Sequence, residues 1–154
     1  MIWTTRIAEQ SDKSTIEALF LEMLRSIYGK EAEKGYEADY LLHFFGGEDR
    51  IYVAEAGGEV VGYLSVEVHR EEQNFLYLDD FCVQASHRGQ GIGTELLDLA
   101  EAYGIELGIG ITVLHVEQSN EAARRLYERR GFALLAEEGS RLKLWKRAYV
   151  ASIL

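Results

Sequence analysis

The glycine-rich segment 88–93, Arg-Gly-Gln-Gly-Ile-Gly, is the part of this sequence with the clearest chemical purpose. It follows an apolar run over residues 75–83 and precedes a helical pattern that begins at Thr94. Glycine lacks Cβ and tolerates positive φ, so a glycine-rich backbone turns sharply and comes close to a ligand. The N–H groups of the first helical turn then point at that ligand, with the positive end of the helix dipole behind them. The order of strand, glycine turn and helix therefore predicts an anion site suited to a pyrophosphate.

Three known phosphate-binding motifs compete for this segment. The Walker form needs Gly-Lys-Ser/Thr, and no lysine occurs between Lys34 and Lys143. The dinucleotide form needs Gly-x-Gly-x-x-Gly, whereas Gly89, Gly91 and Gly93 alternate with single residues. The pattern Arg/Gln-x-x-Gly-x-Gly/Ala fits, with its first residue at position 88.

A second motif follows about thirty residues later, at residues 120–132, Asn-Glu-Ala-Ala-Arg-Arg-Leu-Tyr-Glu-Arg-Arg-Gly-Phe. An apolar run over 109–116, typical of a buried strand, separates the two motifs. The first motif resembles the acetyl-CoA loop of the GCN5-related N-acetyltransferases (GNAT), and the second resembles that family's Asn-x-x-Ala-x-x-x-Tyr-x-x-x-Gly-Phe signature. The resemblance covers residues 52–146 and implies acetyl-CoA as cosubstrate.

The resemblance implies an α+β, three-layer acyl-CoA N-acyltransferase fold, with a mixed sheet of about seven strands and four helices. The chain has the size of one domain, expected over residues 1–154. Periodicity predicts helices after a capping box at Ser14–Glu17, over 36–45, over 93–107 and over 120–131. It predicts strands over 3–7, 50–56, 59–69, 76–83, 111–116, 132–136 and 141–146.

Composition limits the possible function classes. A net charge of −10 argues against a general nucleic-acid binder and suits either a cationic acceptor or simple solubility. No apolar run approaches the roughly 20 residues of a membrane span, and the N-terminus lacks the layout of a signal peptide. Cys82 is the only cysteine, which suits a reducing compartment. We therefore expect a cytoplasmic protein without membrane partners.

The resemblance assigns the cofactor contacts. Backbone N–H groups from Arg88 to Thr94 would hold the pyrophosphate, and the amide of Val83 would polarise the thioester carbonyl. Asn120 would reach the pantetheine arm, serve as the N-cap of its helix, or do both. The cofactor-binding residues expected on this basis are Phe81, Cys82, Val83, Arg88, Gly89, Gln90, Gly91, Ile92, Gly93, Thr94, Asn120, Ala123 and Tyr127.

Tyr127 is the expected general acid, because a phenol suits proton donation to a thiolate of comparable basicity. It shares one helix face with Asn120 and Ala123. The alternative is a core tyrosine. Cys82 as a nucleophile would require a ping-pong mechanism and a histidine partner, which no spacing provides.

The general base is expected at Asp79 or Asp80, which sit inside an apolar strand where an unpaired carboxylate is costly. The stretch 77–81, Tyr-Leu-Asp-Asp-Phe, resembles Tyr-Leu-Glu-Asp-Phe of the diamine (spermidine/spermine) acetyltransferases. The shorter Asp79 side chain favours a water relay over direct proton abstraction, and a purely structural carboxylate is the alternative. Glu67 is a second candidate base. None of the four histidines has a partner at ligand spacing, so no metal is expected.

The leading hypothesis is direct acetyl transfer to a primary amine of a small molecule, polyamine-like or otherwise cationic. The alternatives are an enzyme that acetylates a protein N-terminus or lysine, and an acyl-CoA-binding module without turnover. The apolar tail 149–154 could support a homodimer or could be a frayed end.

Overall fold

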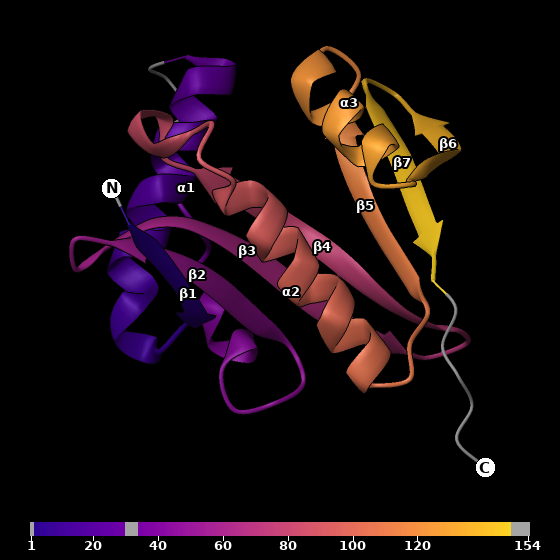
Figure 1. Cartoon of the computed structure of the whole chain (residues 1–154), viewed down its shortest axis with the longest axis horizontal. Coiled ribbons are helices and arrows are strands. Elements are labelled where there is room, and N and C mark those ends of the chain that lie inside the picture. The colour runs from indigo at the N-terminus through magenta and orange to yellow at the C-terminus, as the bar shows by residue number, and fades with distance from the viewer. Residues whose placement is uncertain (1, 30–33, 149–154) are drawn as a thin grey trace. The chain divides into compact units, whose positions relative to one another are not determined.

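A computed structural model describes residues 2–29 and 34–148, which form seven strands, three α-helices and three short 3₁₀ segments (Figure 1). In chain order the elements are β1 (Trp3–Ile7), η1 (Gln10–Asp12), α1 (Lys13–Tyr28), η2 (Tyr40–Phe44), β2 (Arg50–Ala56), β3 (Glu59–Arg70), β4 (Asn74–Val83), η3 (Ala85–His87), α2 (Ile92–Glu106), β5 (Ile111–Glu117), α3 (Glu121–Arg129), β6 (Ala133–Glu138) and β7 (Arg141–Arg147). Hydrogen bonding orders the strands β1-β2-β3-β4-β5-β7-β6. The expected mixed seven-stranded sheet is confirmed.

The chain divides into two compact units. Unit 1 comprises residues 1–67 and 80–100, and unit 2 comprises residues 68–79 and 101–154. Strands β3 and β4 and helix α2 contribute residues to both units. The expectation of a single domain over residues 1–154 stays a prediction, and the two units are described one at a time.

Unit 1 is built on the antiparallel strands β1, β2 and β3. Gly57 and Gly58, at φ 59° and 82°, form the two-residue turn between β2 and β3, because such a turn needs positive φ at both central positions. Helix α1 buries Ile16 and Leu19 in a core with Ile51 and other apolar side chains of the unit. Burial of this apolar stripe is the main stabilising contribution to the helix.

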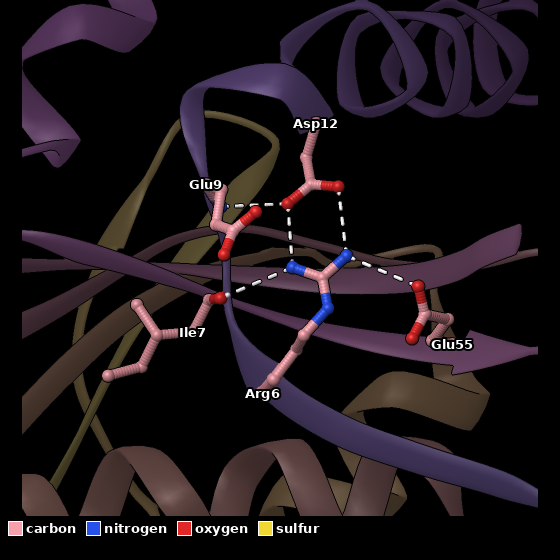
Figure 2. A network of polar contacts seen from close by, with 5 residues as sticks. All are labelled: Arg6, Ile7, Glu9, Asp12 and Glu55. Carbon is pink, nitrogen blue, oxygen red and sulfur yellow. Dashed lines mark hydrogen bonds and ion pairs between the residues drawn. The ribbon is translucent and has the colours of Figure 1, made fainter. Parts of the chain in front are cut away.

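An ionic network ties β1 to the start of α1 and to β2. Figure 2 shows the Arg6 guanidinium facing the Asp12 carboxylate. Arg6 Nη1 donates to Asp12 Oδ2 at 2.7 Å, and Nη2 donates both to Asp12 Oδ1 at 3.0 Å and to Glu55 Oε1 at 3.3 Å. The backbone N–H of Glu9 donates to the same Asp12 carboxylate at 2.7 Å. These hydrogen bonds hold the pKa of Asp12 below its usual value, the bond from Arg6 having the largest effect.

Unit 2 contains the first residues of β4, a short parallel ladder to β5, and antiparallel pairings of β5 with β7 and of β7 with β6. One face of these strands is apolar and buried, with Leu76, Leu114 and Leu144 all under 8% exposed. Gly104 of α2 packs directly against this unit's core, because a Cβ there would lie 2.9 Å from Leu76 Cδ1 and 3.1 Å from the carbonyl oxygen of Ile109.

Two helix predictions were wrong in detail. The second helix, expected over 36–45, is only the 3₁₀ segment η2, so the described residues hold three α-helices rather than four. Asp39 adopts φ 64°, a left-handed conformation that cannot lie inside a right-handed helix. The predicted capping box at Ser14 is also displaced. Helix α1 already begins at Lys13, and the reciprocal capping pair is Glu9 with Asp12 around η1.

No helix in the described part of the chain is long and apolar enough to cross a membrane. The tail 149–154, on which the homodimer expectation rested, lies outside the described residues.

Candidate functional site

The glycine loop in unit 1 has the backbone that the sequence predicts. Gly89 and Gly91 adopt φ 77° and 88°, values that residues with a Cβ rarely reach. Helix α2 begins at Ile92, one residue before the predicted start, and the N–H of Glu95 bonds to the carbonyl of Gly91. The amides that precede Glu95 therefore belong to the first helical turn, whose N–H groups have no intrahelical acceptor. This arrangement can bind an anion.

Gly93 serves a different purpose from the other two glycines. Its φ is not positive, but a Cβ there would lie 3.0 Å from Cζ of Phe81. The absence of a side chain therefore lets the first turn of α2 approach the end of strand β4. The sequence placed Phe81 and Gly93 in one site, and the structure brings them into contact.

The backbone of residues 81–83 is held firmly within unit 1. The side chain of Arg88 donates from Nε to the carbonyl of Val83 at 3.1 Å. A Cβ at Gly62 would lie 3.1 Å from the carbonyl oxygen of Cys82, so β3 and β4 approach closely at this point. Cys82 is 7% exposed, and its thiol lies 3.6 Å from the carbonyl oxygen of Leu19.

Burial raises the pKa of the Cys82 thiol to about 11, so it stays protonated at neutral pH. A protonated, buried thiol is a poor nucleophile. The structure therefore agrees with the sequence argument against a ping-pong route through Cys82.

Asp80, one of the two predicted base candidates, lies in a network of phenols in unit 1. The hydroxyl of Tyr36 donates to Asp80 Oδ2 at 2.7 Å and lies 2.9 Å from the hydroxyl of Tyr63. Because Tyr36 has a single hydroxyl proton, Tyr63 is the donor in the second bond. Burial raises the pKa of Tyr36 well above its usual value, and the neighbouring Tyr63 and Asp80 add to this effect, so Tyr36 remains a donor.

Aromatic rings and carboxylates surround Tyr36. Phe20 and Tyr40 stack on it, with ring centroids at 4.0 and 5.1 Å. Tyr36 and Tyr40 also line a pocket of about 450 Å³ in the same unit. The charged side chains that line this pocket are Lys13, Glu17, Glu37 and Asp39. Carboxylates outnumber the single lysine three to one, so the pocket favours a cation.

Helix α3 in unit 2 carries the second motif. Asn120 is its N-cap, and the Asn120 side-chain oxygen accepts a hydrogen bond from the Ala123 N–H at 3.1 Å. The capping role considered for Asn120 is therefore confirmed, and its cofactor contact stays a prediction. Gly131, at φ 94°, follows the helix in the usual C′ position.

Tyr127, the predicted general acid, lies near the end of α3 and is 7% exposed. Its ring packs edge-on against Phe132, with centroids 5.7 Å apart. Burial raises the pKa of the Tyr127 phenol, which ensures that the proton is present at neutral pH. Arg130 and Lys146 both form ion pairs with Glu101, which fixes the end of α3 within unit 2.

The other two candidate bases, Asp79 and Glu67, lie in different units. Asp79 is partly buried on β4 in unit 2. Glu67 Oε2 lies 4.0 Å from Nε2 of His43 in unit 1, at the limit of an ion pair. Across residues 2–29 and 34–148, no three His, Cys, Asp or Glu side chains gather as a metal set.

The sequence interpretation missed one cluster of titratable groups, on the strands of unit 2. His115 Nδ1 lies 2.6 Å from the hydroxyl of Tyr77, and His115 Nε2 lies 2.6 Å from Glu138 Oε1. Spacing could not reveal this cluster, because the partners are 38 and 23 residues from His115. The one available signal was a histidine between two apolar residues, Leu114 and Val116.

Comparison with known proteins agrees with this geometry. The profile of the acetyltransferase (GNAT) family matches residues 17–132. The N-acetyltransferase YhfO of Bacillus subtilis is 31% identical over 135 residues, which cover 82% of this chain and 87% of that protein. An N-acetyltransferase of Methanocaldococcus jannaschii is 39% identical over 122 residues, which cover 79% and 72%.

Solved structures show the same fold. The N-acetyltransferase PaiA of Thermoplasma acidophilum, in complex with coenzyme A, superimposes with a TM-score of 0.78 at 18% identity, covering 96% of this chain and 100% of that one. YncA of Salmonella typhimurium, with acetyl-CoA, gives 0.79 at 19% identity, covering 100% and 98%.

The fold and the two motifs define an acyltransferase. The chain belongs to the GNAT family and is an acetyl-CoA-dependent N-acetyltransferase.

Proposed function

We propose that this enzyme transfers the acetyl group of acetyl-CoA directly to a primary amine of a small cationic molecule. The observation that carries the choice of acceptor is the Asp80 carboxylate, bonded to Tyr36 beside a pocket with an excess of carboxylates. A substrate that carries several ammonium groups satisfies both the carboxylates and the aromatic rings. The net charge of −10 would also attract such a substrate over longer distances.

In the proposed function, the glycine loop and the end of β4 bind acetyl-CoA. Amides of residues 88–94 bind the pyrophosphate, because they combine free N–H groups with the helix dipole. The amide of Val83 polarises the thioester carbonyl, where negative charge develops during attack. Phe81 and Gly93, which touch each other, hold the loop against the strand. Asn120 and Ala123, at the start of α3, contact the pantetheine arm.

Tyr127 acts as the general acid in this proposal. The amine nitrogen forms a bond to the thioester carbon, and the carbon–sulfur bond breaks with its electron pair on sulfur. The sulfur then takes the phenolic proton of Tyr127, which is later replaced from solvent. The buried position of Tyr127 keeps that proton in place until the thiolate forms.

A charge-removing variant tests the acceptor class. Asp80→Asn keeps an oxygen that accepts from Tyr36 but removes the negative charge. We expect the KM for spermidine to rise by about 10- to 100-fold, the equivalent of one hydrogen bond to a charged group. Glu71→Gln is the matched control, because it removes the charge of an exposed loop carboxylate. A KM that changes equally little in both variants would contradict the cationic pocket.

Acetylation of a protein N-terminus is the second candidate, and one relative favours it. The N-terminal acetyltransferase complex ARD1 subunit homolog of Dictyostelium discoideum is 37% identical over 90 residues, which cover 57% of this chain and 44% of that protein. A short peptide with a free N-terminus, assayed beside spermidine, separates the two. A higher kcat/KM on the peptide would replace the small-molecule proposal.

A further inference from the structure

The pocket beside Tyr36 is formed by the first half of α1 and by the segment that leads into η2. It has a volume of about 450 Å³, and its lining residues lie between positions 13 and 21 and between positions 36 and 42. All of them belong to unit 1, as do the glycine loop and residues 81–83. The pocket and the backbone proposed to bind the thioester therefore lie in one compact unit.

Glu17 is the least exposed carboxylate of this pocket. It is partly buried, whereas Glu37 and Asp39 are exposed. A carboxylate that is shielded from water attracts a cation more strongly, because the effective dielectric constant around it is lower. No hydrogen bond or ion pair joins Glu17 to another residue in the described part of the chain, including Lys13 one turn earlier on α1. The charge of Glu17 is thus available to a ligand.

Gly35 lies directly against this carboxylate. A Cβ at position 35 would be 2.8 Å from Oε1 of Glu17, closer than Cβ atoms come to other atoms in proteins. Gly35 does not have a positive φ, so its backbone conformation does not itself require glycine. The lack of a side chain at position 35 leaves the space that the Glu17 carboxylate occupies. Helix α1 and the chain at Gly35 therefore confine this carboxylate from two sides.

Aromatic rings form another part of the pocket wall. The ring of Tyr36 stacks with the rings of Phe20 and Tyr40, at interplanar angles of 14° and 16°. Tyr36 and Tyr40 both line the pocket. Aromatic faces attract ammonium groups and also pack against methylene groups. The pocket thus combines a carboxylate for an ammonium group with an apolar wall for a hydrocarbon chain.

Tyr36 connects the pocket to the end of β4. It lines the pocket, and its hydroxyl donates to Asp80 Oδ2 at 2.7 Å. Asp80 directly precedes residues 81–83. An elongated molecule that lies along Tyr36 therefore has one end in the pocket and the other end beside Asp80.

We propose that Glu17 is a specificity-determining residue, which binds a second ammonium group of the acceptor, distal to the amine that is acetylated. The inference rests on the proposed function and narrows the acceptor class to diamines and longer polyamines. The distal ammonium forms an ion pair with Glu17, and the methylene chain lies against the rings of Tyr36 and Tyr40. The amine that is acetylated lies toward Asp80. A monoamine with the same carbon chain makes all of these contacts except the ion pair.

Lys13 is the one cationic side chain among the lining residues, and it leaves the pocket negative. Glu17, Glu37 and Asp39 outnumber it by two charges. A distal ammonium group offsets part of this excess, whereas the methyl end of a monoamine does not. The pocket should therefore discriminate by charge between two amines of the same length.

The diamine 1,4-diaminobutane and the monoamine 1-aminobutane share one carbon chain and differ in the distal ammonium group. We expect kcat/KM of the whole chain to be at least about tenfold higher on the diamine, as one hydrogen bond to a charged group implies. Glu17→Gln keeps the size of the side chain and removes its charge. It should lower this ratio to about two, the number of equivalent amines in the diamine, and leave kcat/KM on the monoamine unchanged.

Glu22→Gln is the matched control for the charge. Glu22 is exposed on the same helix and is not among the residues that line this pocket. Both variants change the net charge by the same amount, so they weaken long-range attraction of a cation equally. The preference for the diamine should persist in Glu22→Gln.

Gly35→Ala moves the Glu17 carboxylate without changing any charge. The added methyl group would lie 2.8 Å from Glu17 Oε1, so the flexible end of Glu17 must turn away while the backbone accepts alanine. We expect the diamine-to-monoamine ratio to fall toward that of Glu17→Gln, with kcat/KM on the monoamine retained. Urea denaturation should give the same midpoint for Glu17→Gln, Glu22→Gln and the wild type, which shows that the substitutions act on specificity rather than on folding.

The outcomes separate the role of Glu17 from the function on which it rests. A wild-type chain that binds acetyl-CoA but acetylates neither amine, nor spermidine, overturns the proposed function and this inference with it. A wild-type chain that acetylates both amines with kcat/KM values within about threefold of each other overturns the role of Glu17 alone. A diamine preference that survives in Glu17→Gln, or that Glu22→Gln removes to the same extent, also overturns it.

Discussion

Replacement of Gly91 by alanine gives a sharp test of the anion site, because the structure isolates one cause of damage. Gly91 adopts φ 88°, and an added Cβ would meet only Cζ2 of Trp3, at an ordinary 3.9 Å. Steric conflict with neighbours is therefore small. The cost comes from the backbone, because an L-residue in the left-handed region costs roughly 1–2 kcal/mol.

That cost can appear in the free energy of unfolding, in the Kd for acetyl-CoA, or partly in each. If the loop keeps its shape, Gly91→Ala lowers the free energy of unfolding by the whole amount. If the loop relaxes, the amides turn away from the pyrophosphate and acetyl-CoA binds more weakly. At about 1.4 kcal/mol per tenfold, the full amount equals a rise in Kd of roughly five- to thirty-fold.

Calorimetric titration with acetyl-CoA and chemical denaturation measure the two parts. Gly47→Ala is the matched control, because Gly47 has no positive φ and nothing lies within 4 Å of its added Cβ. The control should differ from the wild type by less than about 0.5 kcal/mol in both assays. If Gly91→Ala matched the control in both Kd and stability, the assignment of the anion site to this loop would be refuted.

Further predictions concern the acid, the core and the ionic network. Tyr127→Phe keeps the buried ring but removes the phenolic proton. It should lower kcat by about 100-fold while acetyl-CoA binding is retained. A loss of kcat below about twofold in steady-state assays would remove Tyr127 from the mechanism. Gly104→Ala should destabilise the chain by about 1–3 kcal/mol in urea, despite the better helix propensity of alanine, because its Cβ would lie 2.9 Å from Leu76. Asp12 has a lowered pKa in the folded chain, so its contribution to stability is present above its ordinary pKa and is lost as the pH falls through the lowered value. Asp12→Asn should therefore flatten the acid limb of the stability curve, and an unchanged limb would show that the pair with Arg6 contributes nothing.

Local features of the fold were predictable from the sequence. The conformations of Gly89 and Gly91 follow from the need of a strand–turn–helix junction for positive φ, which glycine meets most easily. The cap at Asn120 was also predictable, because its side chain accepts a hydrogen bond from an amide only three residues away. The short η2 segment was not predictable. Apolar spacing over 36–45 resembles a helix, but the left-handed Asp39 interrupts the segment and only η2 follows it.

The side-chain networks depend on contacts that no local pattern encodes. Tyr36 reaches Asp80 across 44 residues of sequence, and their meeting depends on how the segment after α1 packs. His115 reaches Glu138 through β7, and the pairing of β6 with β7 contains an irregularity between Leu134 and Ala136. A one-residue shift in that register would turn Glu138 to the other face. The sequence could name acidic candidates for the base, but it could not reveal that His115 lies between Tyr77 and Glu138.

The central claim is catalysis of acetyl transfer from acetyl-CoA to a primary amine, and one assay tests it most directly. The whole chain is incubated with acetyl-CoA and each of a panel of amines, from polyamines and aminoglycosides to amino acids and short peptides. Free thiol is followed with time, and the acetylated product is identified by its mass. The account predicts stoichiometric thiol release and N-acetylation, with the highest kcat/KM on a multiply charged small amine. Acetyl-CoA binding confirmed by calorimetry, together with no thiol release above background from any amine, would contradict it.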